Sequence, residues 1–142
     1  MSAALLYSEI FEQFDKCTTR QERIDLLRKN GDPRFKTFLQ LAFDPSVKFD
    51  VEAPPYRPAV EPAGMNFAYL DTEMNRMYRF FNHPSKPPIT QDKQRSLLLV
   101  ILEALHKDEA ALMVKLFKKD LEINYLTPKL VKEAFPDMPF EA

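Results

Sequence analysis

Apolar residues recur at intervals of three and four along most of the chain, the spacing that places side chains on one face of an α-helix. The first such run includes Ile10, Phe11 and Phe14 and predicts a helix near the N-terminus. The next run follows Thr19-Arg20-Gln21-Glu22, a sequence suited to a capping box. We expect this second helix to end at Asn30-Gly31 in a left-handed turn, because glycine adopts positive φ without steric cost.

Capping residues also stand in front of each later apolar stripe and predict where further helices begin. The helix after Thr90 has the widest stripe, so we expect it to be the central and most buried one. The pattern as a whole predicts an all-α fold, a single compact bundle of about seven helices forming one domain over residues 1–142. The later helices are expected to start at Asp32-Pro33, Asp71-Thr72 (with Tyr78 facing inward), Thr90, Asp108-Glu109 and Thr127-Pro128.

The helical spacing disappears between residues 44 and 64, a stretch rich in proline. Proline fixes φ and has no backbone N–H group, so this stretch must be extended or looped. It also contains Phe49, Val51, Tyr56 and Val60, which make it too apolar for a solvated linker. We therefore expect an ordered, proline-rich arm that lies over the helices; a domain boundary is the alternative.

The composition argues against several classes of enzyme. Only 2 glycines are present, and no Walker or dinucleotide-binding motif occurs. Cys17 is the single cysteine and cannot form an internal disulfide. His83 and His106 have no partners at metal-binding spacing, and His106 is expected near a helix C-terminus. We therefore expect a protein that is not an enzyme and needs no metal or cofactor.

The longest apolar run, residues 97–102, is far too short to cross a bilayer. The first residues lack the basic region of a signal peptide. These features predict a soluble, cytoplasmic protein with no membrane partner.

Basic side chains cluster in the first and last thirds of the chain. If these thirds pack side by side, the clusters would form a track along a duplex backbone, where phosphate contacts supply much of the affinity. Ordinary solvated helix faces are the alternative, because acidic residues such as Glu22 and Glu133 are interleaved and the net charge is only -1. The clusters comprise Arg20, Arg23, Arg28, Lys29, Arg34 and Lys36, and then Lys115, Lys118, Lys119, Lys129 and Lys132.

The tail, residues 118–136, has the pattern of a helix end, a tight turn and a short capped helix closed by proline. Together with residues 19–24, 26–30 and 35–43, it resembles the N-terminal DNA-binding domain of ATP-dependent DNA ligases of T-even-type phages. The resemblance covers nearly the whole chain. It is most specific at Asp120-Leu121-Glu122, Leu130-Val131 and Phe135-Pro136-Asp137-Met138-Pro139.

In that ligase family the domain is a helical bundle that grips nicked duplex DNA across the minor groove. The resemblance implies DNA contacts from the turn at Asn124, Tyr125 and Thr127 and from the following Lys129. Asn124 stands where the family usually has glycine, although asparagine also tolerates left-handed φ. For Tyr125 the pattern leaves two orientations open, outward toward a sugar or partner and inward into the core.

The nucleotidyltransferase domain of a ligase, with its lysine nucleophile, has no counterpart in this sequence. We therefore expect a non-catalytic accessory protein, phage-encoded and located in the host cytoplasm, that binds duplex or nicked DNA through phosphate contacts. The alternative is an adaptor or inhibitor of replication or transcription machinery, favoured by the near-neutral charge, the apolar arm and the apolar, acidic end at residues 135–142. The candidate DNA-binding residues are Arg20, Arg23, Lys118, Lys119, Asn124, Tyr125, Thr127, Lys129 and Lys132.

Overall fold

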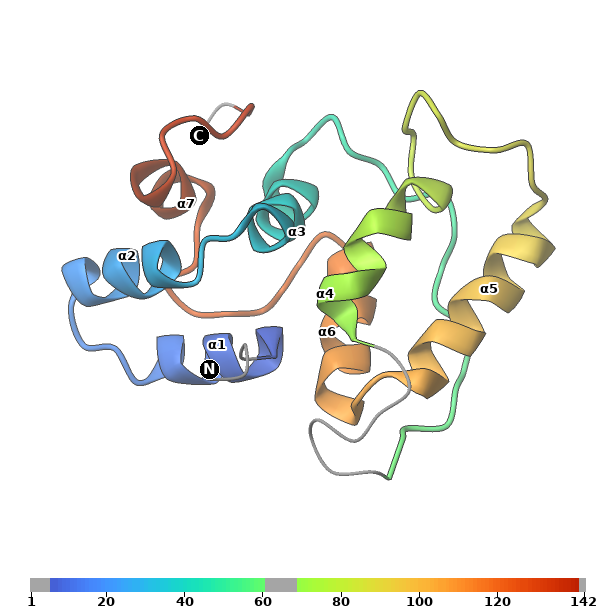
Figure 1. Cartoon of the computed structure of the whole chain (residues 1–142), viewed down its shortest axis with the longest axis horizontal. Coiled ribbons are helices and arrows are strands. Elements are labelled where there is room, and N and C mark those ends of the chain that lie inside the picture. The colour runs from blue at the N-terminus through green and yellow to red at the C-terminus, as the bar shows by residue number, and fades with distance from the viewer. Residues whose placement is uncertain (1–5, 61–68, 141–142) are drawn as a thin grey trace.

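Helices account for the regular secondary structure in residues 6–60 and 69–140, the parts of the chain that this computed structural model describes (Figure 1). Within them, extended backbone pairs only at an isolated antiparallel bridge between Phe49 and Phe81. The all-α prediction is confirmed. The elements are α1 (Tyr7–Asp15), α2 (Arg20–Lys29), α3 (Pro33–Phe43), α4 (Leu70–Glu73), the 3-10 helix η1 (Met74–Arg79), α5 (Gln91–Ala104), α6 (Lys107–Phe117) and α7 (Pro128–Ala134).

Side-chain caps start many of these helices where the sequence predicts them. At α6 the cap is His106, whose Nδ1 accepts a hydrogen bond from the backbone N–H of Asp108 at 3.2 Å. His106 thus begins α6, and it directly follows Leu105, the C-cap of α5, which agrees with its predicted place near a helix C-terminus. The caps that accept a hydrogen bond from the backbone N–H three residues further on, at 2.9 to 3.1 Å, are Thr19, Asp32, Thr90 and Thr127.

Gly31 has a different role from the predicted one. Its backbone is not left-handed, and the C-cap of α2, Asn30, has φ -103°. A Cβ atom at Gly31 would lie 2.5 Å from Cε1 of Phe135. Glycine leaves room here for the Phe135 ring, which packs directly against the end of α2.

α6 is the central helix of the fold. It packs against α1, α3, α4 and α5, and its residues Ala110, Met113 and Leu116 are fully buried. α5 lies at one end of the molecule, and its main helix contact is with α6 (Figure 1). The prediction that α5 is central is wrong because one side of α5 faces the proline-rich arm and another faces solvent, where Val100 is 68% exposed.

The 3-10 geometry of η1 decides which of its side chains enter the core. With three residues per turn, side chains at positions i, i+3 and i+6 share a face. Met74, Met77 and Phe80 are accordingly buried. Tyr78, which helical spacing predicts to face inward, is exposed and lies against the ring of His83 at a centroid distance of 5.9 Å.

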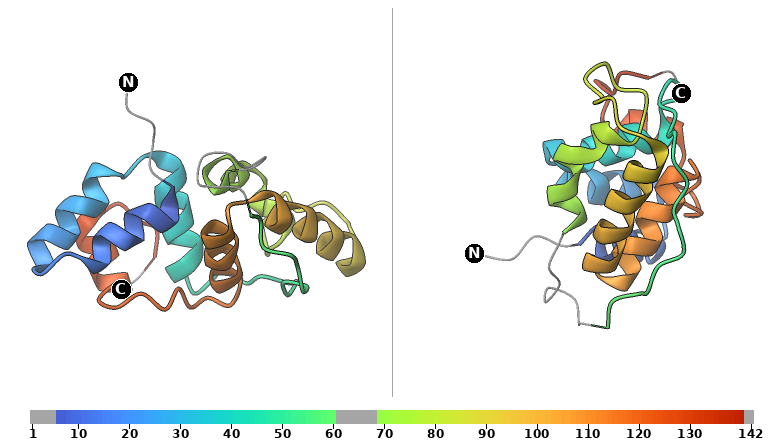
Figure 2. Two further views of the ribbon diagram at one scale, coloured as in Figure 1. Left: turned by 90° about the horizontal axis from the view of Figure 1, so that it is seen from below. Right: turned by 90° about the vertical axis from the view of Figure 1, so that its right-hand side faces the viewer.

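The proline-rich arm is ordered over its described part, residues 44–60; its remaining predicted residues, 61–64, lie outside the described segments. Val47 and Val51 are buried, and the ring of Phe49 stacks on Phe117 of α6 at 4.4 Å. The arm runs along the outer side of α5 and α6 (Figure 2). These contacts confirm a packed arm over residues 47–51, whereas Val60, which the sequence predicts to pack with them, is 92% exposed.

A buried carboxylate joins α6 to the start of α1. Glu109 is 1% exposed and accepts hydrogen bonds from the backbone N–H groups of Tyr7 at 3.0 Å and Ser8 at 2.6 Å. These N–H groups belong to the first turn of α1, where no intrahelical acceptor exists. Burial raises the pKa of Glu109, although the two hydrogen bonds act in the opposite direction.

No helix within the described residues is long and apolar enough to span a membrane.

Candidate nucleic-acid interface

The tail begins with a Schellman turn at the end of α6. The backbone N–H of Lys119 bonds to the carbonyl of Leu116 at 2.9 Å, and that of Asp120 bonds to the carbonyl of Lys115 at 3.1 Å. Lys119 adopts the left-handed conformation that this motif requires, with φ 61°. A lysine therefore occupies the position where glycine is the usual residue.

The side chain of Lys119 is partly exposed and is held by hydrogen bonds to the end of another helix. Its Nζ donates hydrogen bonds to the carbonyl oxygens of Leu41 at 2.6 Å and Asp44 at 2.7 Å, which lie at the C-terminal end of α3. Burial lowers the pKa of Lys119, and nearby Asp44 partly offsets this. Lys119 thus caps α3, and its predicted place among the DNA contacts is not supported by this geometry.

The turn that follows presents an aromatic ring to solvent. Tyr125 has φ 68° and is 68% exposed, so the outward orientation is the observed one. A second left-handed residue, Glu122, has φ 57°. Asn124 is exposed but is not left-handed, which corrects the expectation based on glycine in the ligases. Positive φ is costly for a bulky side chain, and such strain often marks a functional position.

Arg23 of α2 supports this ring from one side. Its guanidinium carbon lies 4.0 Å from the centroid of Tyr125, a cation–π contact. One of its nitrogens, Nη2, donates to the carbonyl of Cys17 at 3.2 Å. The Nε–H group is buried and has no hydrogen-bond partner among the residues that the structure describes. Arg23 and Tyr125 therefore form a preorganised pair although they are far apart in sequence.

The start of α7 places two more candidates beside Tyr125. The hydroxyl of Thr127 accepts from the backbone N–H of Leu130 and keeps its own hydrogen available as a donor. Lys129 is exposed and makes no ion pair with any described residue. Residues 124–129 therefore provide an amide, a phenol ring, a hydroxyl and an ammonium group within one short stretch.

Arg20 and Lys132 are held by contacts within the protein. Arg20 forms a two-pronged ion pair with Glu133, with distances of 2.7 and 3.0 Å, and hydrogen bonding from Arg20 lowers the pKa of Glu133. The Nζ of Lys132 donates to the carbonyl of Met138 at 2.7 Å. Neither cation is as available to a ligand as Lys129.

The first and last thirds of the chain do pack side by side, as the proposed basic track requires. α2 packs against α7, and Arg28 donates hydrogen bonds to the carbonyls of Glu133 and Ala134. Lys118 is not part of this face, because it lines a groove between the arm and α6. The face that the structure brings together is therefore smaller than predicted: Arg23, Asn124, Tyr125, Thr127 and Lys129, which we call the α2–α7 face.

Comparison with known families matches residues 10–123 to a model described as a family of unknown function, DUF6433. The chain belongs to the DUF6433 family. The match runs from α1 through α6 and ends at Ile123, so the DUF6433 match contains Arg23 while Tyr125 and α7 follow it. No curated protein matches this chain.

Proposed function

We propose that this DUF6433 protein is a non-catalytic accessory protein, encoded by a phage and located in the host cytoplasm, that binds duplex or nicked DNA with its α2–α7 face. The observation that carries the proposal is the outward ring of Tyr125 with the Arg23 guanidinium behind it. The strained backbone at Tyr125 holds this ring in solvent. An exposed ring gains no stabilisation from burial.

The contacts would be made with the sugar–phosphate backbone. The face of the Tyr125 ring fits against a deoxyribose, while Lys129, the Thr127 hydroxyl and the Asn124 amide donate hydrogen bonds to phosphates. None of these groups reads a base, so binding is independent of sequence. The resemblance of the tail to phage DNA ligases supports DNA as the ligand, and a nick as a preferred feature of it.

The expected affinity is modest. The face holds two cations, Lys129 and Arg23, so about one or two phosphates are neutralised. The logarithm of the binding constant should then fall with the logarithm of salt concentration with a slope of about -1 to -2. A net charge of -1 also lowers the long-range attraction of DNA to the protein. The interaction should therefore be measurable at low salt and weak near physiological salt.

Fluorescence anisotropy with a labelled nicked duplex and the matching intact duplex tests this proposal. Lys129→Glu and Tyr125→Ala change exposed side chains of the α2–α7 face and should weaken binding by about tenfold or more at low salt. Lys107→Glu and Tyr78→Ala provide matched controls on exposed residues of α6 and η1. Equal binding by all four variants, or no binding by the wild-type protein at low salt, would refute the proposal.

An adaptor role is the second candidate, and folding accounts for two of the sequence features that favour it. Met138 and Phe140 near the C-terminus are buried, and the arm packs its apolar residues Val47 and Val51 against the helices. What supports a protein partner is instead a groove beside the arm.

A further inference from the structure

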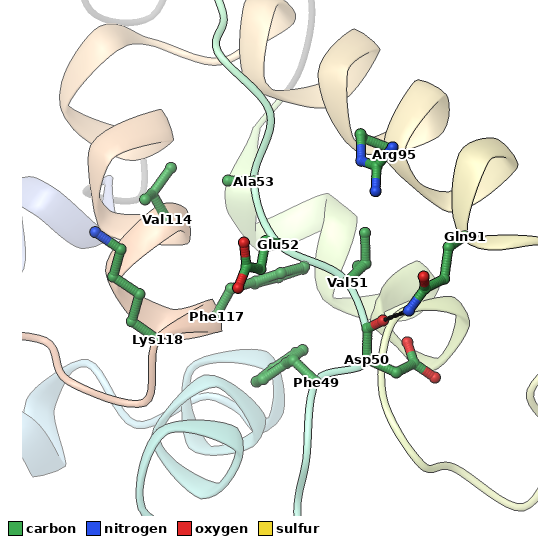
Figure 3. Close-up of a pocket in the computed structure, with 10 residues that line it drawn as sticks. All are labelled: Phe49, Asp50, Val51, Glu52, Ala53, Gln91, Arg95, Val114, Phe117 and Lys118. Atoms are coloured by element: carbon green, nitrogen blue, oxygen red, sulfur yellow. Dashed lines mark hydrogen bonds between the residues drawn. The ribbon is translucent and has the colours of Figure 1, made fainter.

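A groove of about 780 Å³ lies along the arm, between the start of α5 and the C-terminal half of α6 (Figure 3). A second hollow of about 410 Å³ shares Val114 and Lys118 with it and continues over α6 toward Tyr56. The two hollows together follow the arm over residues 49–56. An extended stretch of this length spans roughly 26 Å, enough for a strand of average length beside it.

The arm backbone is fixed at two points and unpaired between them. At one end the N–H of Asp50 bonds to the carbonyl of Phe80 at 3.0 Å, and at the other the N–H of Arg57 bonds to the Glu103 carboxylate at 2.9 Å. The backbone N–H and C=O groups of residues 51–53 make no hydrogen bond to any other described residue. Val51 lies at a bend, and Glu52 and Ala53 have no regular secondary structure. Their unpaired backbone groups can pair with a further strand.

Apolar side chains form the floor of the groove, and basic side chains stand on both sides of the arm. Val114 and Phe117 provide the apolar surface from α6. Lys118 makes no ion pair with a described residue, and Arg95 has only a solvent-exposed contact with Asp92 at 3.3 Å. Figure 3 shows Lys118 and Arg95 on opposite sides of the arm. Glu52 also lines the groove and adds one negative charge beside these two cations.

We propose that this groove binds an extended segment of a partner protein, which adds as a strand to residues 51–53. Small or β-branched side chains of the segment pack on Val114 and Phe117, and a carboxylate of the segment pairs with Lys118 on the same side of the arm. The site is separate from the α2–α7 face, so this inference does not depend on DNA binding.

The unpaired backbone favours an extended occupant over a helix or a nucleic acid. A helix satisfies its own backbone groups and would bury the N–H groups of residues 51–53 without partners, which is unfavourable. A phosphate backbone would meet the Glu52 carboxylate beside Lys118. An extended peptide pairs with the backbone and can place a neutral side chain next to Glu52.

A display library of random dodecapeptides, selected on the intact protein, tests the proposal without assuming a partner. The enriched peptides should combine Asp or Glu with Val, Ile or Thr. In hydrogen exchange followed by NMR, the amides of Val51, Glu52 and Ala53 should exchange rapidly in the free protein and become protected when a synthetic enriched peptide binds. Methylating alternate backbone nitrogens of that peptide should weaken binding at least about tenfold.

Charge reversal provides the matched comparison. Lys118→Glu should lower the affinity for an enriched peptide by about tenfold, because one exposed charge contact is lost and a repulsion is gained. Lys29→Glu makes the same charge change on an exposed residue of α2 and should leave binding unchanged. A library that yields no binder, a bound peptide that leaves residues 51–53 unprotected, or equal binding by both variants would overturn the proposal.

Discussion

Replacing Lys119 with methionine should destabilise the fold and leave DNA binding intact. Methionine keeps an unbranched side chain but removes the ammonium group that caps α3 at the carbonyls of Leu41 and Asp44. A hydrogen bond to a charged group contributes about 1.5–3 kcal/mol to stability, and this is lost when the charged donor is removed and its acceptor is left without a partner. Leu41 and Asp44 are buried but Lys119 is partly exposed, so each hydrogen bond is only partly buried and water can replace part of it. We therefore expect a total loss of about 2 kcal/mol.

Glycine at the same position separates the cap from the backbone strain. Lys119→Gly loses the same two hydrogen bonds but relieves the left-handed conformation, which costs a non-glycine residue about 1–2 kcal/mol. The two effects partly cancel, so the net loss should be about 1 kcal/mol or less. The expected order of stability is therefore wild type, then Lys119→Gly, then Lys119→Met.

Urea denaturation followed by circular dichroism measures these free energies of unfolding. A loss of about 2 kcal/mol corresponds to a decrease in melting temperature of roughly 8 °C for a domain of this size. Below the unfolding transition, Lys119→Met should bind a nicked duplex as the wild type does. The reasoning is refuted if Lys119→Gly is less stable than Lys119→Met, or if Lys119→Met unfolds with the wild-type free energy.

Three further changes test other parts of the structure. Gly31→Ala should cost about 1–3 kcal/mol in urea denaturation, because its Cβ would lie 2.5 Å from the Phe135 ring; an unchanged midpoint would contradict this contact. Phe49→Ala should lower the free energy of unfolding by about 2 kcal/mol, which is less than the loss for a fully buried phenylalanine, and should speed amide exchange in the arm. Amide exchange in the arm that stays slow would show that the stack on Phe117 does not hold the arm in place. Burial raises the pKa of Glu109 above 4.5, so the folded state holds this proton more tightly than the unfolded state. The stability from this group is then fully present below pH 4.5 and is lost as the pH rises through the raised pKa. In urea titrations, the excess free energy of unfolding of wild type over Glu109→Gln should therefore shrink from about pH 4 to about pH 7. An excess that grows over this range would show that the pKa is shifted in the opposite direction.

Helix positions could be predicted from the sequence because their signals are local. Thr19, Asp32, Thr90 and Thr127 each cap a backbone group three residues away, a distance that the sequence shows directly. Which helix is central could not be predicted in this way. The apolar stripe of α5 is wide because it meets both α6 and the arm, and the stripe alone does not tell a helical neighbour from an extended one.

The candidate site was harder to predict because the availability of a cation depends on distant partners. Arg20 pairs with Glu133, and Lys119 caps carbonyls on α3, across sequence separations of 113 and 78 residues. No local pattern shows such contacts. The Arg23–Tyr125 pair is likewise non-local, although both residues belong to the predicted set. The positive φ at Tyr125 gave no sequence signal, because tyrosine is an unusual residue for that conformation.

The most direct test of the proposed function is to locate the bound DNA on the protein. In an NMR titration of the isotopically labelled protein with a nicked duplex at low salt, the account predicts that the largest shifts occur at Arg23, Tyr125, Thr127 and Lys129. Amides of the arm, residues 51–53, should not move. Saturable shifts confined to other surfaces, or no shifts at millimolar duplex, would contradict DNA binding by the α2–α7 face.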